Sequence, residues 1–146
     1  MLFRSFRKRS QRIFRISMIY NSKVYVDKSP IHGWGVFASC EINEGDTIEV
    51  CPILTLPIQK NEITSLLIDY RFNWPQGEIW EEQVVCLGFG SLYNHSNNAN
   101  AYWVSDESNR TFVFKAKQKI NRNSEILIYY GDENYWNDGR QTIQVS

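Results

Sequence analysis

The polar segment YNHSNNAN, residues 93–100, is the most informative part of this 146-residue chain. It holds four asparagines, one histidine and one serine within eight positions. Such side chains hydrogen-bond to the backbone around them and would hold an irregular conformation. Taken alone, the pattern predicts a structural loop that is neither helix nor strand, because Asn and Ser are ordinary turn residues.

Two further segments lie upstream and downstream of it. The segment GWG, residues 33–35, has two glycines that would let the backbone approach a ligand closely, although a plain turn explains it as well. The segment YYGD, residues 129–132, ends a predicted strand in two tyrosines, and its plain interpretation is a strand cap with surface aromatics. Each signal is unremarkable alone, but their order and spacing together indicate a site.

The rest of the pattern predicts mainly short strands. Apolar or alternating runs predict extended segments at residues 23–27, 36–38, 47–56, 84–87, 111–116 and 125–130. One segment changes to helical spacing and predicts a short amphipathic helix over residues 61–70, with its apolar face at Ile63, Leu66, Leu67 and Tyr70. The expected fold class is therefore mainly β (α+β), in one compact domain.

Composition excludes several classes of protein. The three cysteines lack CxxC spacing and are odd in number, which argues against a disulfide framework and a cysteine-rich zinc site. Two histidines are too few for a multi-histidine metal centre. No run of about 18 apolar residues occurs, so no transmembrane helix is expected. The aromatic content of 14% suggests a tight β core, an aromatic-walled pocket, or both.

The net charge of zero is the sum of two different parts. Residues 1–17 carry six Arg and Lys and no acid, which leaves ten basic against sixteen acidic residues, a net charge of −6, in the rest. The basic segment has three interpretations: a targeting presequence, a nuclear address or nucleic-acid arm, or a disordered extension before a true start at Met18. The acidic remainder suits a basic partner, because opposite charges steer association.

Together the three segments make the chain similar to the SET-domain protein-lysine methyltransferases, and in particular to the minimal SET histone H3 methyltransferases of large algal viruses. Residues 28–38 resemble the family's first motif, whose GxG turn lies against the methyl donor. Residues 93–100 resemble its NHSCxPN signature, and residues 125–131 resemble its E-L-x-x-x-Y-G motif. The motifs keep the family's order, and the resemblance covers about residues 22–136.

The resemblance implies a SET-domain β-clip fold of short strands with one short helix and a knot-like threading of the C-terminal segment. It implies a basic, disordered extension at residues 1–17, a SET domain at 22–136 and a tail at 137–146. The chain departs from the signature at Asn97, where the family has Cys, and at Ala99, where it has Pro. No cysteine cluster flanks the domain, so no metal is expected, and the short tail would close the lysine channel.

The resemblance also implies the residues of the site. Its cofactor is S-adenosyl-L-methionine, and Tyr130 occupies the position of the catalytic tyrosine. The expected cofactor contacts come from Gly33, Trp34, Gly35, Asn94, His95, Tyr130 and Trp136. The candidate walls of the lysine channel are Tyr70, Tyr93, Ile128 and Tyr135.

Some of these residues have a second interpretation. Ordinary core packing is the alternative for Trp136, Tyr70 and Tyr93. A general base is the alternative role for His95, because histidine titrates near neutrality. The aliphatic Ile128 stands where the family commonly has Phe or Tyr, and the extra room favours multiple methylation.

The expected function is methyl transfer from S-adenosylmethionine to a neutral lysine amine of a basic tail, with histone H3 as the leading candidate. The resemblance further implies a chromatin regulator, a nuclear location if the substrate is a histone, and a homodimer. Neither a membrane nor a specific nucleic acid is expected as a partner. Two other functions stay open: a non-catalytic binding module that keeps the fold, and a nucleic-acid-binding protein that uses the basic segment.

Overall fold

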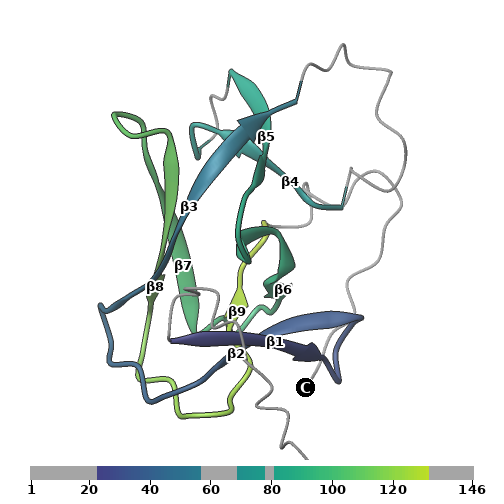
Figure 1. Cartoon of the computed structure of the whole chain (residues 1–146), viewed down its shortest axis with the longest axis vertical. Coiled ribbons are helices and arrows are strands. Elements are labelled where there is room, and N and C mark those ends of the chain that lie inside the picture. The colour runs from purple at the N-terminus through teal and green to yellow at the C-terminus, as the bar shows by residue number, and fades with distance from the viewer. Residues whose placement is uncertain (1–22, 57–68, 78–80, 132–146) are drawn as a thin grey trace, which may run out of the picture.

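The largest element of the structure is a five-stranded antiparallel sheet with the strand order β4-β5-β3-β8-β7 (Figure 1). The computed structural model describes residues 23–56, 69–77 and 81–131. The sheet contains β3 (Thr47–Thr55), β4 (Arg71–Trp74), β5 (Glu82–Cys86), β7 (Ala101–Asp106) and β8 (Thr111–Ala116).

Alternation of side chains decides which face of this sheet is buried. In β8, Phe112, Phe114 and Ala116 are fully buried or nearly so, while the residues between them lie on the outer, partly exposed face. The ladder from β3 to β8 ends at Pro52, which has no N–H to donate, and the ladder from β3 to β5 begins at Ile53. The predicted strand therefore continues through its proline by changing partner.

Two smaller sheets complete the described structure. The hairpin of β1 (Val24–Lys28) and β2 (Trp34–Ala38) is antiparallel. The strands β6 (Asn94–His95) and β9 (Leu127–Ile128) are parallel and have only two residues each. Figure 1 shows this short pair between the large sheet and the hairpin. A single turn of 3-10 helix, η1 (Gly90–Leu92), precedes β6.

The structure confirms the mainly β prediction and most of the predicted strands. It differs at residues 94–100, which begin with a two-residue strand, and at residues 125–130, where only Leu127–Ile128 form a strand. Both differences have one cause: these segments pair with each other, over a ladder too short to leave a periodic pattern. Strands β4 and β7 were missed.

Several predictions concern residues outside the described ranges. They include the basic extension at 1–17, the helix at 61–70 except for its last two residues, Tyr135, Trp136 and the tail at 137–146. The knot-like threading of the C-terminal segment stays a prediction. Within the described ranges, no helix has the length and apolar character that a bilayer crossing requires.

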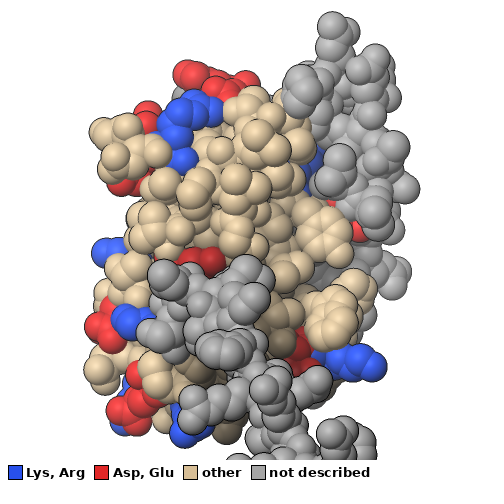
Figure 2. Space-filling view, in the orientation of Figure 1, with Lys and Arg blue, Asp and Glu red and all other residues tan. Residues whose placement is uncertain are grey.

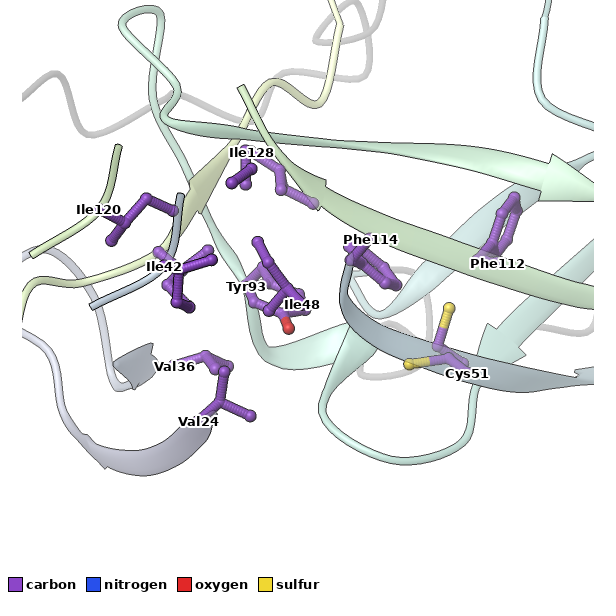
Figure 3. Close-up of a cluster of buried hydrophobic side chains, with 14 of the residues drawn as sticks. Val24, Val36, Ile42, Ile48, Cys51, Tyr93, Phe112, Phe114, Ile120 and Ile128 are labelled. Carbon is purple, nitrogen blue, oxygen red and sulfur yellow. The ribbon is translucent and has the colours of Figure 1, made fainter. Parts of the chain in front are cut away.

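Aromatic rings fill the core between the large sheet and the two small ones. Phe114 lies near its centre, stacks on Tyr93 with ring centroids 4.6 Å apart, and meets Phe72 edge-on at 6.4 Å. Figure 3 shows Tyr93 among Ile42, Ile48 and Phe114, which come from three different parts of the chain. A tight aromatic core was one of the two explanations for the high aromatic content, and here it accounts for much of it.

We predict that Phe114→Ala lowers the free energy of unfolding by about 3–5 kcal/mol, because it removes a fully buried ring and leaves a cavity. Urea denaturation measures the loss. The matched control is Val104→Ala on the neighbouring strand β7, where the side chain is exposed, and its cost is expected to stay below about 1 kcal/mol. Equal losses in the two variants would contradict this account of the core.

Candidate functional site

The parallel pairing of β6 with β9 brings the three predicted segments together. Asn94 pairs with Leu127 and His95 with Ile128, and Ser96 N donates to Ile128 O at 3.0 Å. On the other side, residues 125–126 lie against the hairpin, where Ile126 N donates to Val36 O at 2.7 Å. The segments at 33–35, 93–100 and 125–131 therefore meet at one place.

The side chain of Asn94 forms the centre of this place. Its Nδ2 lies 3.1 Å from the backbone oxygens of both His32 and Trp34 and 2.8 Å from Oε1 of Glu125, so its two N–H groups are shared among three acceptors. Three acceptors around one end of the amide identify that end as the nitrogen. Among the described residues none donates to Oδ1.

Glu125 connects the Asn94 amide to the turn before β2. Its Oε2 accepts a hydrogen bond from Ser29 Oγ at 3.0 Å, and the same Ser29 oxygen accepts the N–H of Ile31 at 2.9 Å. A Cβ at Gly35 would overlap the Glu125 carboxylate, whose Cδ would lie 2.9 Å from it. Gly35 thus makes room for Glu125, a residue that we did not assign to the site, although its place in the third motif was a signal.

Tyr130 is held at both ends by the residues that flank Asn94. Its backbone N–H donates to His95 Nδ1 at 3.0 Å, and its hydroxyl donates to the backbone oxygen of Tyr93. The rings of Tyr130 and His95 lie 5.3 Å apart between centroids. The position and direction of the phenol are therefore set by the segment 93–95.

His95 is a buried, neutral side chain with both ring nitrogens engaged. Nδ1 accepts the N–H of Tyr130, so the ring proton is on Nε2, which donates to Asn97 Oδ1 at 3.1 Å. Burial lowers the pKa of His95, and the hydrogen bond with Asn97 opposes this in part. These contacts give the ring a structural role and argue against its alternative role as a general base.

Tyr93 belongs to the core through its ring and to the site through its backbone. Its hydroxyl donates to Glu49 Oε2 at 3.0 Å, and the other oxygen of this buried carboxylate accepts the N–H of Phe89 at 2.9 Å. Burial and then the charge of Glu49 raise the pKa of Tyr93, so the phenol stays neutral. This placement favours the core-packing alternative for the ring.

The other expected site residues lie in different environments. Trp34 contributes its backbone oxygen to Asn94, while its side chain is 57% exposed. Ile128 is fully buried in the core, and Tyr70 is 40% exposed, with its backbone oxygen accepting from Ser91 Oγ at 3.0 Å. Gly33 adopts φ +52°, with open space where a side chain would be. Trp136 and Tyr135 lie outside the described residues.

The charges of the described surface are mixed. In Figure 2, basic and acidic side chains are interspersed around the edge of the visible face, and uncharged residues fill much of its middle. Glu82 is paired with Arg110 at 2.9 Å, and the Arg110 hydrogen bond, followed by that of Thr55, lowers the pKa of Glu82. Much of the charge of Glu82 is thus compensated within the chain.

Comparison with known proteins gives consistent matches. The family model described as the SET domain matches residues 33–131. The histone-lysine N-methyltransferase, H3 lysine-37 specific, of Schizosaccharomyces pombe is 32% identical over 109 residues, which are 73% of this chain and 71% of the relative.

Two solved structures have similar folds. A proposed histone methyltransferase of Plasmodium falciparum matches with a TM-score of 0.62 and 34% identity, over 77% of this chain and 96% of that one. A SET domain histone lysine methyltransferase of Neurospora matches with a TM-score of 0.58 and 18% identity, over 75% of this chain and 52% of that one. This second likeness bears on the fold alone and supports the predicted arrangement of short strands.

We predict that His95 makes the stability of the protein fall as the pH decreases below about 6.5, the pKa of an unfolded histidine. Because burial lowers the pKa of His95 in the folded state, the unfolded chain takes up the proton first, and acid favours unfolding. Urea denaturation between pH 5 and pH 7 measures this slope in the wild type and in His95→Gln.

The variant should lose part of the slope, whatever its stability at pH 7. The matched control is His32→Gln, which changes the one other histidine of the chain, an exposed residue. Identical slopes for His95→Gln and the wild type would contradict a buried neutral imidazole.

Proposed function

The chain belongs to the SET domain family and is a protein-lysine N-methyltransferase, and we propose that it transfers methyl groups from S-adenosylmethionine to a lysine in the tail of histone H3. One observation carries the proposal: hydrogen bonds of Asn94, Glu125 and Tyr130 connect the three motif segments at one place. They hold the Asn94 amide and the Tyr130 phenol within the same site.

The donor set of the site fits S-adenosylmethionine. This cofactor has an ammonium group that needs acceptors, and Asn94 Oδ1 is an acceptor to which no described residue donates. The backbone of residues 33–35 and that of His95 border the same amide and supply further polar groups. When bound, the cofactor supplies a methyl group on positively charged sulfur, which makes that carbon electrophilic.

Six of the seven expected cofactor residues lie in the described structure. We propose that Gly33, Trp34 and Gly35 act through their backbone, Asn94 through its side chain and His95 through its backbone. Trp136 remains a candidate for stacking on the adenine.

We assign the catalytic role to Tyr130. Its hydroxyl hydrogen is donated to the backbone oxygen of Tyr93, so its oxygen keeps lone pairs that can accept a hydrogen bond from the lysine amine. An accepted hydrogen bond of this kind would turn the nitrogen lone pair of the amine toward the methyl group. For an in-line displacement, such positioning supplies much of the rate enhancement.

The proposed substrate follows from charge and from the relative in fission yeast, which is described as specific for lysine 37 of histone H3. Outside residues 1–17 the chain has a net charge of −6, which suits the basic tail of a histone. Because Glu82 is paired with Arg110, this attraction would come from the domain as a whole and not from Glu82.

Further predictions of the resemblance belong to this proposal. They are nuclear action as a chromatin regulator, a homodimer, and a lysine channel with the candidate walls Tyr70, Tyr93, Ile128 and Tyr135. The hydrogen bonds that hold Asn94 and Tyr130 in the site favour an active enzyme over a non-catalytic binding module.

We predict that Tyr130→Phe lowers kcat by about 100-fold or more, because it removes the hydroxyl that orients the amine. A radiolabelled methyl-donor assay on core histones and on a cell lysate measures turnover, and calorimetry measures cofactor binding, which should change little. The matched control is Tyr129→Phe, the neighbouring and more exposed tyrosine, which should keep wild-type turnover.

Label on histone H3 would support both the enzyme class and the substrate. Label confined to non-histone proteins would keep the enzyme and exclude the proposed substrate. Near-normal turnover by Tyr130→Phe would refute the assignment of this residue.

We further predict multiple methylation of the target lysine, because the aliphatic Ile128 leaves more room than Phe or Tyr and has no hydroxyl to hold water or amine. Mass spectrometry of the labelled peptide at long reaction times identifies the products. Dimethyl- and trimethyl-lysine are expected, and a product that stops at monomethyl-lysine would contradict the prediction.

A further inference from the structure

We propose that Asn97 is a positioning residue for the proposed methyl transfer: through His95 it holds the backbone of Tyr130 in place. The contact runs from Asn97 Oδ1 to His95 Nε2 at 3.1 Å and from His95 Nδ1 to the N–H of Tyr130 at 3.0 Å. This inference rests on the proposed function, because the role of Tyr130 is part of it.

The directions of the two hydrogen bonds that link Tyr130, His95 and Asn97 follow from one fixed donor. The backbone N–H of Tyr130 can only donate, so His95 Nδ1 has to accept and carries no proton. A neutral imidazole then has its proton on Nε2, and the group facing it has to be an acceptor. The side-chain oxygen of Asn97 supplies that acceptor, and it thereby stabilises the tautomer that can hold Tyr130.

Position 97 is also one of the two positions at which this chain departs from the signature that it resembles. A cysteine sulfur is a weak hydrogen-bond acceptor, whereas an amide oxygen is a good one. The asparagine at position 97 therefore supplies a contact toward the proposed catalytic tyrosine.

Protonation of His95 would break this arrangement. An imidazolium has a proton on both nitrogens, and its Nδ1–H would face the N–H of Tyr130, two donors without an acceptor. The titratable groups whose rings face His95 are Tyr129 and Tyr130, with centroids at 5.4 and 5.3 Å. Among the described residues, no charged side chain contributes to the shift in the pKa of His95. Burial lowers this pKa, and the hydrogen bond with Asn97 raises it in part.

Two substitutions at position 97 test the inference in the full-length chain. Asn97→Ala removes the acceptor and should lower kcat by about tenfold, the equivalent of one hydrogen bond, with a smaller change in KM for the cofactor. Asn97→Asp keeps an acceptor but adds a negative charge that stabilises the imidazolium. Its kcat at alkaline pH should approach that of the wild type, while the acidic limb of its pH-rate profile should move to higher pH.

The matched control is Asn98→Ala, a change at the neighbouring exposed asparagine, which should keep the wild-type kcat and pH profile. Wild-type kcat and an unmoved acidic limb in both Asn97 variants would overturn the inference. A merely structural role of Asn97 predicts loss of folded protein in both variants without a shift of the limb, and that result would overturn it too.

A measurement that needs no activity separates this inference from the proposed function. The chain has two histidines, so long-range proton–nitrogen NMR spectra contain two imidazoles, and His32→Gln assigns them. The wild type should show His95 with its proton on Nε2, and a proton on Nδ1 would overturn the inference. Absence of any methyl transfer by the wild type would instead refute the proposed function, and with it the catalytic part of this role.

Discussion

The amide group of Asn94 is the contact on which the site depends. Its two N–H groups are shared among three oxygens that lie 62, 60 and 31 positions away in the sequence, in the turn before β2, in β2 itself and in the third motif. A buried amide that lost these acceptors would pay the cost of desolvation without compensation. Because the Glu125 carboxylate has to reach this amide, Gly35 cannot have a side chain. The arrangement of the three segments therefore depends on the hydrogen bonds that these buried polar groups require.

The aromatic core and the site meet at Tyr93. Its ring stacks on Phe114 and its hydroxyl satisfies the buried Glu49, while its backbone oxygen accepts from the Tyr130 hydroxyl. Packing of the core thus decides where the proposed catalytic phenol points. The two buried cysteines belong to the same core: the hydrogen bond with Cys86, followed by burial, raises the pKa of the Cys51 thiol, so it stays protonated.

Local patterns were enough to predict the strands that alternate between a buried and an exposed face. Phe112 and Phe114 in β8 are the clearest case, because a period of two is visible in the sequence itself. The pairing of β6 with β9 could not be predicted in this way, since two residues per strand leave no period and the partners are more than 30 positions apart. The role of Glu125 was missed for a similar reason: its carboxylate becomes part of the site only when the hairpin places Ser29 and Asn94 on either side of it.

The sequence by itself determined the fold class, the family and the identity of the proposed catalytic tyrosine, because these depend on motifs whose order and residue types are read directly from the chain. Only the tertiary structure decided what the individual side chains do. It placed the ring of Tyr93 in the core, paired Glu82 with Arg110, and set the tautomer of His95 by contacts from Tyr130 and Asn97. The physical reason is that hydrogen bonds and desolvation act between atoms a few ångströms apart, and that proximity exists only after distant segments have packed together.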